Sequence, residues 1–321
     1  MKFTALAFLT LAIGTTALPV PPSIQSRATS ASPYTTTQIL QLALTLEHLE
    51  SAFYTQALSS FTAANFTAAG FPDSVRERFL QISEHESQHV KLLSSALGND
   101  SVQPCTYAFD GRYKDVGSFI GLASVIENLG VSAYAGAAQY ITDPVYATVA
   151  STILSTEARH QAWQNAAVLG QNPWGSPYDT VLTPDMVFTI ASELIASCPS
   201  TNPTLPFKTY PLLTVNNEVI GSPGDHVVFT FADNHTEVNY AIFYSGLGAQ
   251  AVQLDENDFA TVPSTLQGIS YVVISTASDP ANVTSDSIVA GPATLDYTFA
   301  ANVTNSGFTG GADPLTADPR F

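Results

Sequence analysis

Two hydrophobic patterns divide the chain near residue 199. Before it, apolar residues recur every three or four positions, as on one face of an amphipathic helix; after it, short β-branched and aromatic runs lie between turn residues. The first pattern predicts helices at 35–61, 72–98, 115–141, 143–170 and 183–197. The second predicts strands at 212–215, 226–231, 240–244, 251–254, 271–275 and 294–299, with turns at 223–225 and 291–292.

The four longer predicted helices carry glutamates on otherwise apolar faces. The second and fourth each hold a glutamate and a histidine three residues apart, which places both side chains on one face, one turn from each other. The first and third each hold a glutamate followed seven residues later by a tyrosine, two turns away on the same face. In chain order the residues are Glu47 with Tyr54, Glu86 with His89, Glu127 with Tyr134, and Glu157 with His160.

The order Glu, Glu-x-x-His, Glu, Glu-x-x-His describes a duplicated helix pair and resembles the ferritin-like family. The whole chain looks like a secreted fungal member of that family, of the group that includes stress-response and late-sexual-development proteins. The resemblance implies that the four helices hold two metal ions between them. The ligands that it implies are Glu47, Glu86, His89, Glu127, Glu157 and His160, with Glu86 and Glu157 as candidates for the bridging carboxylates.

The connections between the helices agree with that topology. Residues 99–114 link the second and third helices, and a chain of this length reaches about 50 Å, enough to run from one end of a bundle to the other. The other two links, at 62–71 and 142–143, are shorter and suit antiparallel neighbours. The predicted fold is mainly α: a ferritin-like four-helix bundle with a long crossover and a fifth helix at 35–199, followed by an immunoglobulin-like β-sandwich at 200–304.

Several neighbouring residues leave alternatives open at the site. Glu50 lies one turn from Glu47 and is the other candidate for the ligand on the first helix, although the repeated Glu-to-Tyr spacing favours Glu47. Tyr54 and Tyr134 are candidates to hydrogen-bond a ligand or to supply an electron. Packing in the core explains these two tyrosines equally well.

A second motif overlaps the first Glu-x-x-His. Residues 85–89 read H-E-x-x-H, the zinc helix of metalloproteases, in which His85 and His89 would be ligands and Glu86 the general base. The extended pattern with glycine and a third histidine is absent, so Glu127 would have to complete the site. This interpretation leaves the remaining glutamates and the second histidine of the repeat unexplained.

The donor set indicates which metals and reactions to expect. Carboxylate oxygens with two imidazoles suit iron or manganese. The resemblance implies oxidase or peroxide-handling chemistry, with oxygen or peroxide as small-molecule partners, in stress or development; enzymatic activity and catalytic residues are left open. The alternative is a non-enzymatic extracellular or cell-wall protein whose β region binds polysaccharide or protein through an aromatic patch including Tyr240, Phe243 or Tyr244.

Several features predict a secreted, extracellular or cell-wall protein. Residues 1–17 read as a signal peptide, 18–34 as a disordered Pro/Ser-rich lead-in, and 305–321 as a loose tail. Two cysteines, Cys105 and Cys198, are expected to form one disulfide in an oxidising compartment. Five triplets are glycosylation acceptors, at Asn65, Asn99, Asn234, Asn282 and Asn302.

The net charge of the chain restricts the classes of partner that it is expected to bind. Acidic residues outnumber basic ones by 27 to 10, and the net charge of −17 argues against a nucleic-acid partner, which requires lysines and arginines to replace counterions. No stretch after the signal segment is predicted to span a membrane. The oligomeric state is left open.

Overall fold

The computed structural model describes residues 32–216, 223–232 and 238–300. The predicted signal peptide at 1–17, most of the lead-in and the tail at 305–321 lie outside the described residues. The same holds for two of the glycosylation acceptors, Asn234 and Asn302. The other three acceptors, Asn65, Asn99 and Asn282, are exposed, as a glycan would require.

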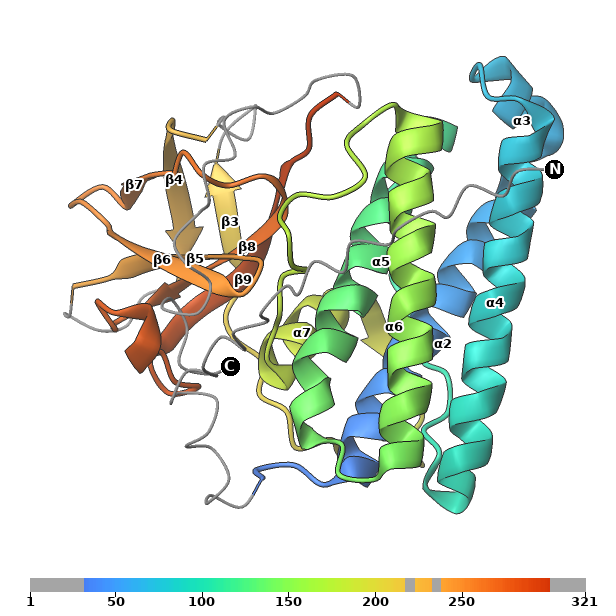
Figure 1. Ribbon diagram of the computed structural model, residues 1–321, viewed down its shortest axis with the longest axis horizontal. Coiled ribbons are helices and arrows are strands. Elements are labelled where there is room, and N and C mark those ends of the chain that lie inside the picture. The colour runs from blue at the N-terminus through green and yellow to red at the C-terminus, as the bar shows by residue number, and fades with distance from the viewer. Residues whose placement is uncertain (1–31, 217–222, 233–237, 301–321) are drawn as a thin grey trace, which may run out of the picture.

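Four long helices form a bundle beside the β region (Figure 1). They begin where the sequence predicts, because Thr35 and Asp115 each close a capping box and Asp143 caps the fourth helix ahead of a proline. Gly170 ends the fourth helix in the left-handed conformation after a π-helical turn. The helices are α2 (Thr36–Ser60), α4 (Asp73–Leu97), α5 (Val116–Ala137) and α6 (Pro144–Trp163), with short helices α3 (Ala63–Ala68), η2 (Gly98–Asp100), η3 (Ala138–Tyr140) and η4 (Gln164–Leu169) at their ends.

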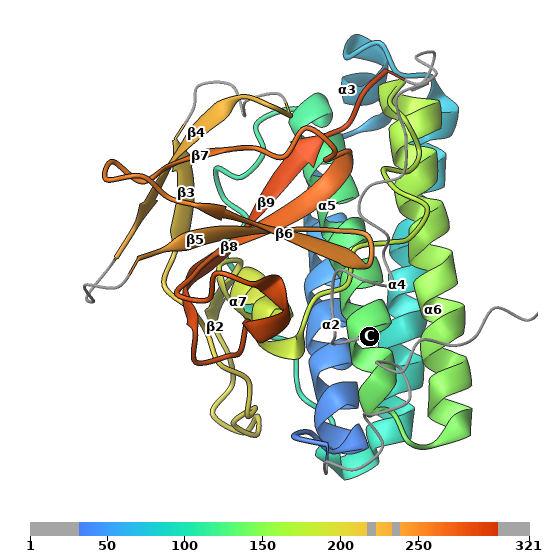
Figure 2. The ribbon, with the colours of Figure 1, turned by 60° about the vertical axis from the view of Figure 1, so that its left-hand side comes forward.

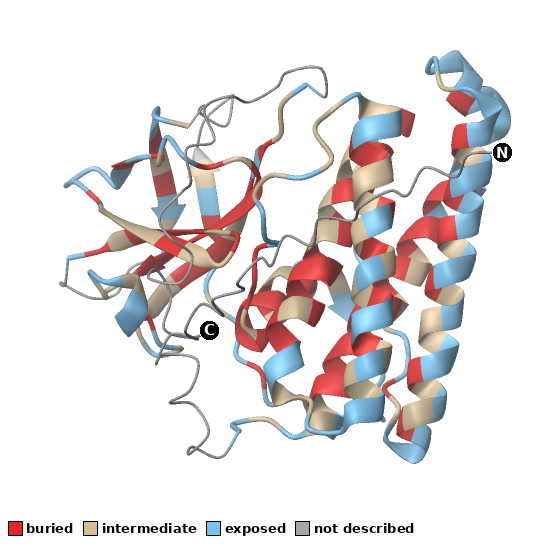
Figure 3. Ribbon diagram, viewed as in Figure 1, coloured by how far each residue is buried: buried red, intermediate tan, exposed pale blue. Residues whose placement is uncertain are grey.

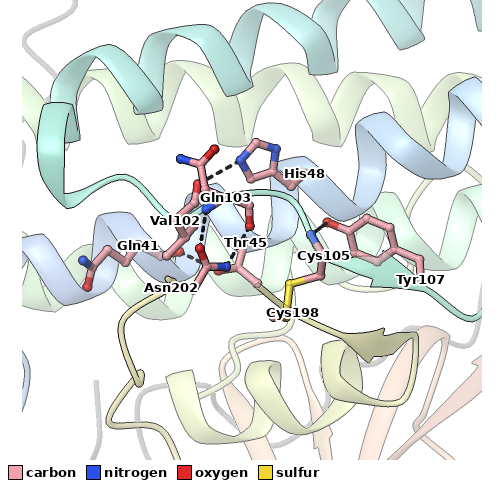
Figure 4. Close-up of a disulfide and its surroundings, with 9 residues drawn as sticks. All are labelled: Gln41, Thr45, His48, Val102, Gln103, Cys105, Tyr107, Cys198 and Asn202. Carbon is pink, nitrogen blue, oxygen red and sulfur yellow. Dashed lines mark hydrogen bonds between the residues drawn. A yellow bond between two sulfur atoms is a disulfide. The ribbon is translucent and has the colours of Figure 1, made fainter. Parts of the chain in front are cut away.

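The crossover from α4 to α5 is long, as predicted, and is fastened along its course (Figure 4). A disulfide joins Cys105 in the crossover to Cys198. Beside it, His48 on α2 hydrogen-bonds the carbonyl of Val102 at 3.1 Å, which holds this histidine against the crossover rather than at the glutamates. Asn202 bonds the backbone of the crossover at 2.7 and 2.8 Å.

The predicted fifth helix is shorter than its sequence pattern suggests. Helix α7 (Pro184–Ser192) ends five residues before the expected end at 197, and Ile195–Ser197 form a strand, β2. This strand pairs antiparallel with β1 (Thr106–Tyr107) in the crossover. Local spacing along the chain cannot predict a pairing between segments about ninety residues apart. The disulfide therefore lies beside a pair of strands, and not at the end of a helix as predicted.

The C-terminal region contains two antiparallel sheets. One has the order β3-β4-β7 and the other β6-β5-β8-β9. Five of the six predicted strands are found within three residues at their starts, and β9 begins six residues early; β7 was not predicted. The strands are β3 (Leu213–Asn216), β4 (His226–Phe231), β5 (Tyr240–Ser245), β6 (Gly248–Gln253), β7 (Phe259–Thr261), β8 (Gly268–Ser275) and β9 (Ile288–Tyr297), with a short helix η5 (Pro280–Asn282) before the last.

The predicted turn at Gly291 and Pro292 is wrong, because both residues lie inside β9. The pairing of β9 with β8 shifts register here: Val272 faces Ala293 while Ile274 faces Ala290. This irregularity admits a proline, which lacks the N–H that a regular ladder needs. The other predicted turn, at 223–225, is present.

The four-stranded sheet is buried on both faces. Its inner face meets the three-stranded sheet through side chains such as Phe229 and Phe243, and its outer face joins the helical core through side chains such as Tyr244 and Tyr271. All eight residues of β8 are buried (Figure 3). Helix α7 lies between this sheet and the bundle (Figures 1 and 2), so one apolar core runs from the bundle into the β region.

Of the three aromatic residues named as examples for a binding patch, two are buried and one is half-buried. Phe243 is 1% exposed and Tyr244 2% exposed, and Tyr240 is half-buried. The three side chains therefore stabilise the sheet and its contact with the helices.

Within the described residues, one helix is long and apolar enough to cross a membrane by length and composition, at Val116–Tyr140. Two thirds of its most apolar window, 67%, is buried within the protein. A helix at the centre of a bundle has the same composition, so this property is weak evidence for a membrane span.

Candidate metal centre

Side chains from all four long helices meet in the middle of the bundle. Four glutamates, one from each helix, are 0% exposed, and His160 is 7% exposed. The side chain of His89 is 13% exposed and stands at the edge of the same cluster. All six residues predicted as ligands are brought together: Glu47, Glu86, His89, Glu127, Glu157 and His160.

One half of the cluster surrounds His89. Its Nδ1 lies 2.8 Å from Glu86 Oε2 and 3.1 Å from Glu47 Oε2. Glu157 Oε1 is 4.0 Å from the same nitrogen. One ligand atom from each of these four residues lies within 4.8 Å of the others, which is close enough to surround one metal ion.

The other half surrounds His160. Its Nδ1 lies 3.1 Å from Glu127 Oε2 and 3.3 Å from Glu86 Oε1. These three residues form a second group of converging ligand atoms. Glu86 belongs to both groups through its two oxygens, which is the geometry of a bridging carboxylate; Glu157, the other predicted bridge, belongs to the first group alone.

The two tyrosines cross between the halves of the helix repeat. The Tyr54 hydroxyl donates to Glu127 Oε1, and the Tyr134 hydroxyl donates to Glu47 Oε1. Each tyrosine thus bonds the glutamate of the other half rather than the one seven residues before it. Each bond engages one carboxylate oxygen and leaves the second facing a histidine nitrogen.

Gln164 belongs to the site and was not predicted. It is 0% exposed and lies one turn after His160, within the π-helical extension of α6. Its amide nitrogen donates to the Tyr54 oxygen at 3.0 Å and lies 3.5 Å from Glu127 Oε1. The spacing of four residues from His160 was the available signal.

Glu50 is also buried beside the site, although it belongs to neither group of converging ligand atoms. Glu50 is 3% exposed, and its Oε2 has no hydrogen-bond partner among the residues that the structure describes. It faces Glu157 across Gly130: a Cβ added to this glycine would lie 2.0 Å from Glu157 Oε2 and 3.0 Å from Glu50 Oε1. Five carboxylates are therefore buried in one place.

Burial and mutual repulsion set the protonation of these groups. Burial raises the pKa of Glu47 to about 7 and raises those of Glu50, Glu127 and Glu157, where charge repulsion among the carboxylates adds to the effect. Burial would also raise the pKa of Glu86, but hydrogen bonds from the two histidines lower it to about 2.

The pKa values of the two histidines are raised, whereas burial ordinarily lowers the pKa of an imidazole. Burial alone would lower the pKa of His89, but hydrogen bonds to Glu47 and Glu86 raise it to about 10. Burial acts likewise on His160, and the charges of Glu127 and Glu86 raise its pKa to about 9. The cluster therefore attracts positive charge, as protons or as metal ions.

The arrangement fits a pair of metal ions. Both oxygens of Glu157 are buried without a hydrogen-bond partner in the described part of the chain, and an unpaired buried carboxylate is costly unless a cation or proton neutralises it. The donors are carboxylate oxygens with two imidazole nitrogens, a set that suits iron or manganese rather than a soft metal. The largest influences on the pKa values of the five glutamates are burial, the other carboxylates, the two histidines and the two tyrosines.

A path from solvent reaches the cluster between α4 and α6. A cavity of about 600 Å³ opens there and is lined by both histidines of the cluster. His85, Trp163 and Arg159 lie on its wall. Small molecules can therefore approach the imidazole side of the site, whereas the glutamates are covered by the helices.

The zinc-helix interpretation does not match this geometry. His85 is exposed and belongs to neither group of converging ligand atoms. Its Nδ1 instead lies 2.9 Å from His160 Nε2, and the two rings are stacked with centroids 5.1 Å apart. His85 and His89 thus do not converge on one position, and His85 orients the outer nitrogen of His160 instead.

Comparison with known proteins agrees with the fold of the helical region. Residues 35–170 match the family of the ferritin-like domain. The helical region is therefore a ferritin-like domain, followed by a region of antiparallel sheets.

One curated relative is protein rds1 of Schizosaccharomyces pombe (strain 972 / ATCC 24843). The chain is 26% identical to it over 193 residues, which is 60% of this chain and 46% of rds1. The match thus spans about half the length of that relative. This distance marks rds1 as a distant homologue.

Proposed function

We propose that the helical domain holds two iron or manganese ions and that the protein reacts with oxygen or peroxide. The observation that carries the proposal is the position of Glu86, whose two oxygens face two separate groups of ligand atoms. The unpartnered oxygens of Glu157 support it, because a buried carboxylate is costly unless a cation or a proton neutralises it.

Each residue has a definite part in this proposal. Glu47, Glu86, His89 and Glu157 would hold one ion; Glu86, Glu127 and His160 would hold the other. Two such ions would supply one-electron redox chemistry with oxygen or peroxide. The protein's own contribution is to fix the ligands: tyrosines and Gln164 hold the glutamates, and His85 holds His160.

The proposal also includes the location of the protein outside the cell or in the cell wall. The signal-like segment at 1–17, the disulfide and the three exposed glycosylation acceptors support a secreted or cell-wall protein. A role in stress or development rests on the family resemblance. The test is to express the full chain in a eukaryotic secretion host and to ask whether it is exported and shortened at its N-terminus.

The β region is proposed to be an immunoglobulin-like sandwich. The three-stranded sheet has the order β3-β4-β7, which are the first, second and fifth strands of the region. The four-stranded sheet has the order β6-β5-β8-β9, which are the fourth, third, sixth and seventh strands. This alternation between sheets and the apolar cluster between them support that proposal. Its position against α7 suggests that it covers one side of the bundle.

The experiment for the metal proposal is metal content with matched variants. The purified chain, loaded with iron or manganese and desalted, is expected to retain about two ions, and Glu86→Gln should lose most of both. Glu84→Gln changes an exposed glutamate on the same helix and should retain both ions. Oxygen uptake and peroxide consumption are then measured on the same samples.

The outcomes are distinct. Metal retained by the parent chain but unaffected by Glu86→Gln would contradict the assigned site. Metal bound as assigned, with no consumption of oxygen or peroxide, would leave a metal site and refute the redox part of the proposal.

A further inference from the structure

The helix repeat is symmetric at its predicted ligands and asymmetric one turn later. Glu47 on α2 corresponds to Glu127 on α5, and each is bonded by a tyrosine from the other half. Three residues later, α2 carries Glu50 where α5 carries Gly130. One half of the site thus has an additional carboxylate, and the other half has no side chain at the corresponding position.

Gly130 is required by the carboxylates that face it. A Cβ at this position would come within 2.0 Å of Glu157 Oε2 and 2.9 Å of its carboxyl carbon. It would also lie 3.0 Å from Glu50 Oε1. Even an alanine would therefore displace Glu157, and the glycine leaves room for the carboxylates of both Glu157 and Glu50.

Nothing in the described part of the chain neutralises this additional carboxylate. Glu50 Oε2 and both oxygens of Glu157 are buried without hydrogen-bond partners. The charged neighbours that act on Glu50 are Glu47, Glu86 and Glu127, all acidic. A carboxylate kept 3% exposed among like charges is costly unless a proton or a cation neutralises it.

We propose that Glu50 is a seventh ligand, bound to the ion held by Glu47, Glu86, His89 and Glu157. This inference rests on the proposed function. It makes the two metal positions unequal: the position at His89 has an excess of carboxylates, and the position at His160 has three protein donors and therefore more room for a small molecule. The unequal positions should bind metal with different affinities.

The test is a manganese titration against a chelator, with electron paramagnetic resonance of the loaded protein as a second readout. The parent chain should bind its ions in two steps. Glu50→Gln keeps the side-chain volume and should weaken one step by about tenfold or more, with the other step unchanged and a changed spectrum. Gly130→Ala should weaken the same step, and circular dichroism establishes that each variant is folded.

Controls separate this inference from the proposed function. Glu84→Gln should behave as the parent chain. If the parent chain and Glu84→Gln bind no metal, the proposed function itself fails and Glu50 has no ion to bind. If the parent chain binds two ions and Glu50→Gln binds both with unchanged affinity and spectrum, Glu50 is not a ligand and the inference is overturned.

A second feature, independent of the metal, is a deep apolar cavity toward the C-terminal end of α4. Its volume is about 550 Å³, in the range of small-molecule sites. Buried aliphatic residues of α2, α5 and α6, such as Leu42, Ala137 and Ala150, line it together with residues of α4. Residues of two apolar clusters line it.

The polar groups of this cavity indicate the ligand. In a chain of net charge −17, the cavity is lined by no carboxylate, and Lys91 is the one charged residue among its described lining residues. The side chain of Lys91 is exposed and has no hydrogen-bond or ion-pair partner among the described residues. Tyr134, which bonds Glu47, lines the same cavity, so its interior adjoins the metal centre.

We propose that this cavity binds a free aliphatic carboxylic acid, with the chain among the apolar residues and the carboxylate at Lys91. The apolar walls favour burial of methylene groups, and the single cation at the entrance favours an anionic head. Binding does not depend on the metal ions, because none of the six ligands that the sequence predicts lines the cavity.

Laurate is the probe, measured by titration calorimetry and native mass spectrometry on the full chain. One laurate per chain is expected. Lys91→Met should weaken laurate binding roughly threefold to fivefold, as for an exposed ion pair, without weakening binding of 1-dodecanol. Lys114→Met, at an exposed lysine away from the cavity, should have no effect.

A second variant tests the position of the chain. Ala96→Phe places a ring at the half-buried edge of the cavity and should abolish binding of both probes while the protein stays folded by circular dichroism. No saturable binding of laurate by the parent chain would overturn the proposal. So would laurate binding that is unchanged in both Lys91→Met and Ala96→Phe.

Discussion

At the scale of single residues, spacing along helices carried most of the information about the site. Glutamate and histidine three residues apart share one helix face whatever the packing, so Glu86 with His89 and Glu157 with His160 could be paired from the sequence. The partners of the tyrosines could not, because a hydrogen bond from Tyr54 to the third helix depends on how the helices pack. The role of Gly130 also depends on helix packing, because the carboxylates that face it belong to other helices.

The tyrosine hydroxyls hold the buried glutamates, which leads to a stability prediction. Tyr134→Phe should destabilise the metal-free protein by about 1–3 kcal/mol, because Glu47 Oε1 loses its donor within a buried site. Urea unfolding measures the change. Tyr178→Phe, at a half-exposed tyrosine, is the control and should have little effect; equal stability of Tyr134→Phe and the parent chain would contradict the role given to this bond.

The pKa shifts at the site predict how stability depends on pH without metal. The raised pKa values of Glu47, about 7, and of His89 and His160, about 10 and 9, mean that the folded chain binds more protons than the unfolded chain, whose ordinary values are 4.5 and 6.5. The stability they contribute is therefore fully present below these ordinary values and is lost as pH rises through the raised ones. The depressed pKa of Glu86 acts oppositely, but only below its ordinary value of 4.5.

We therefore expect chelator-treated protein to be more stable near pH 5 than near pH 9. Urea unfolding at several pH values measures this. Metal-loaded protein should show a weaker decline, because bound cations replace the protons. Equal or greater stability of the metal-free protein at pH 9 would contradict the pKa shifts.

At the scale of elements, the helices were predictable because their signals are local. Thr35, Asp115 and Asp143 cap the helices that they were expected to start. The sequence predictions are wrong where long-range pairing decides the structure: they place a helix end at β2 and a turn at Gly291 and Pro292, and they include no strand at β7. The short pattern of β7 becomes a strand through its pairing with β4.

The disulfide constrains the crossover and supports a prediction at this scale. It closes a sequence separation of 93 residues, for which the loss of unfolded-state entropy corresponds to about 4–5 kcal/mol. Replacing both Cys105 and Cys198 with serine should lower the free energy of unfolding by up to that amount. Denaturant unfolding of the oxidised parent chain, the reduced parent chain and the double variant measures it; identical midpoints would show that the crossover is held by its other bonds.

At the scale of the whole molecule, the bundle and the sheets share a core. The outer face of β8 packs toward the helices, and the Tyr271 hydroxyl meets Asn128 at 3.0 Å and Ser132 at 3.3 Å on α5. The composition predicted two regions but not their contact. The continuous apolar run in β8 is the sequence feature that indicates burial on both faces.

This shared core predicts a single cooperative unfolding transition. Calorimetry of the full chain should show one peak, because separating the sheets from α5 and α7 would expose apolar surface on both sides. Alanine at Tyr271 should lower the transition of the entire protein. Two well-separated transitions, with the helical one unchanged by that substitution, would contradict the coupling.

The central claim, that the four helices hold two metal ions bridged by Glu86, is tested most directly by anomalous diffraction from crystals of iron- or manganese-loaded protein. The account predicts two anomalous peaks, one beside His89 and one beside His160, with the Glu86 carboxylate between them. A single peak held by His85 and His89, or no peak among the glutamates after loading, would contradict it.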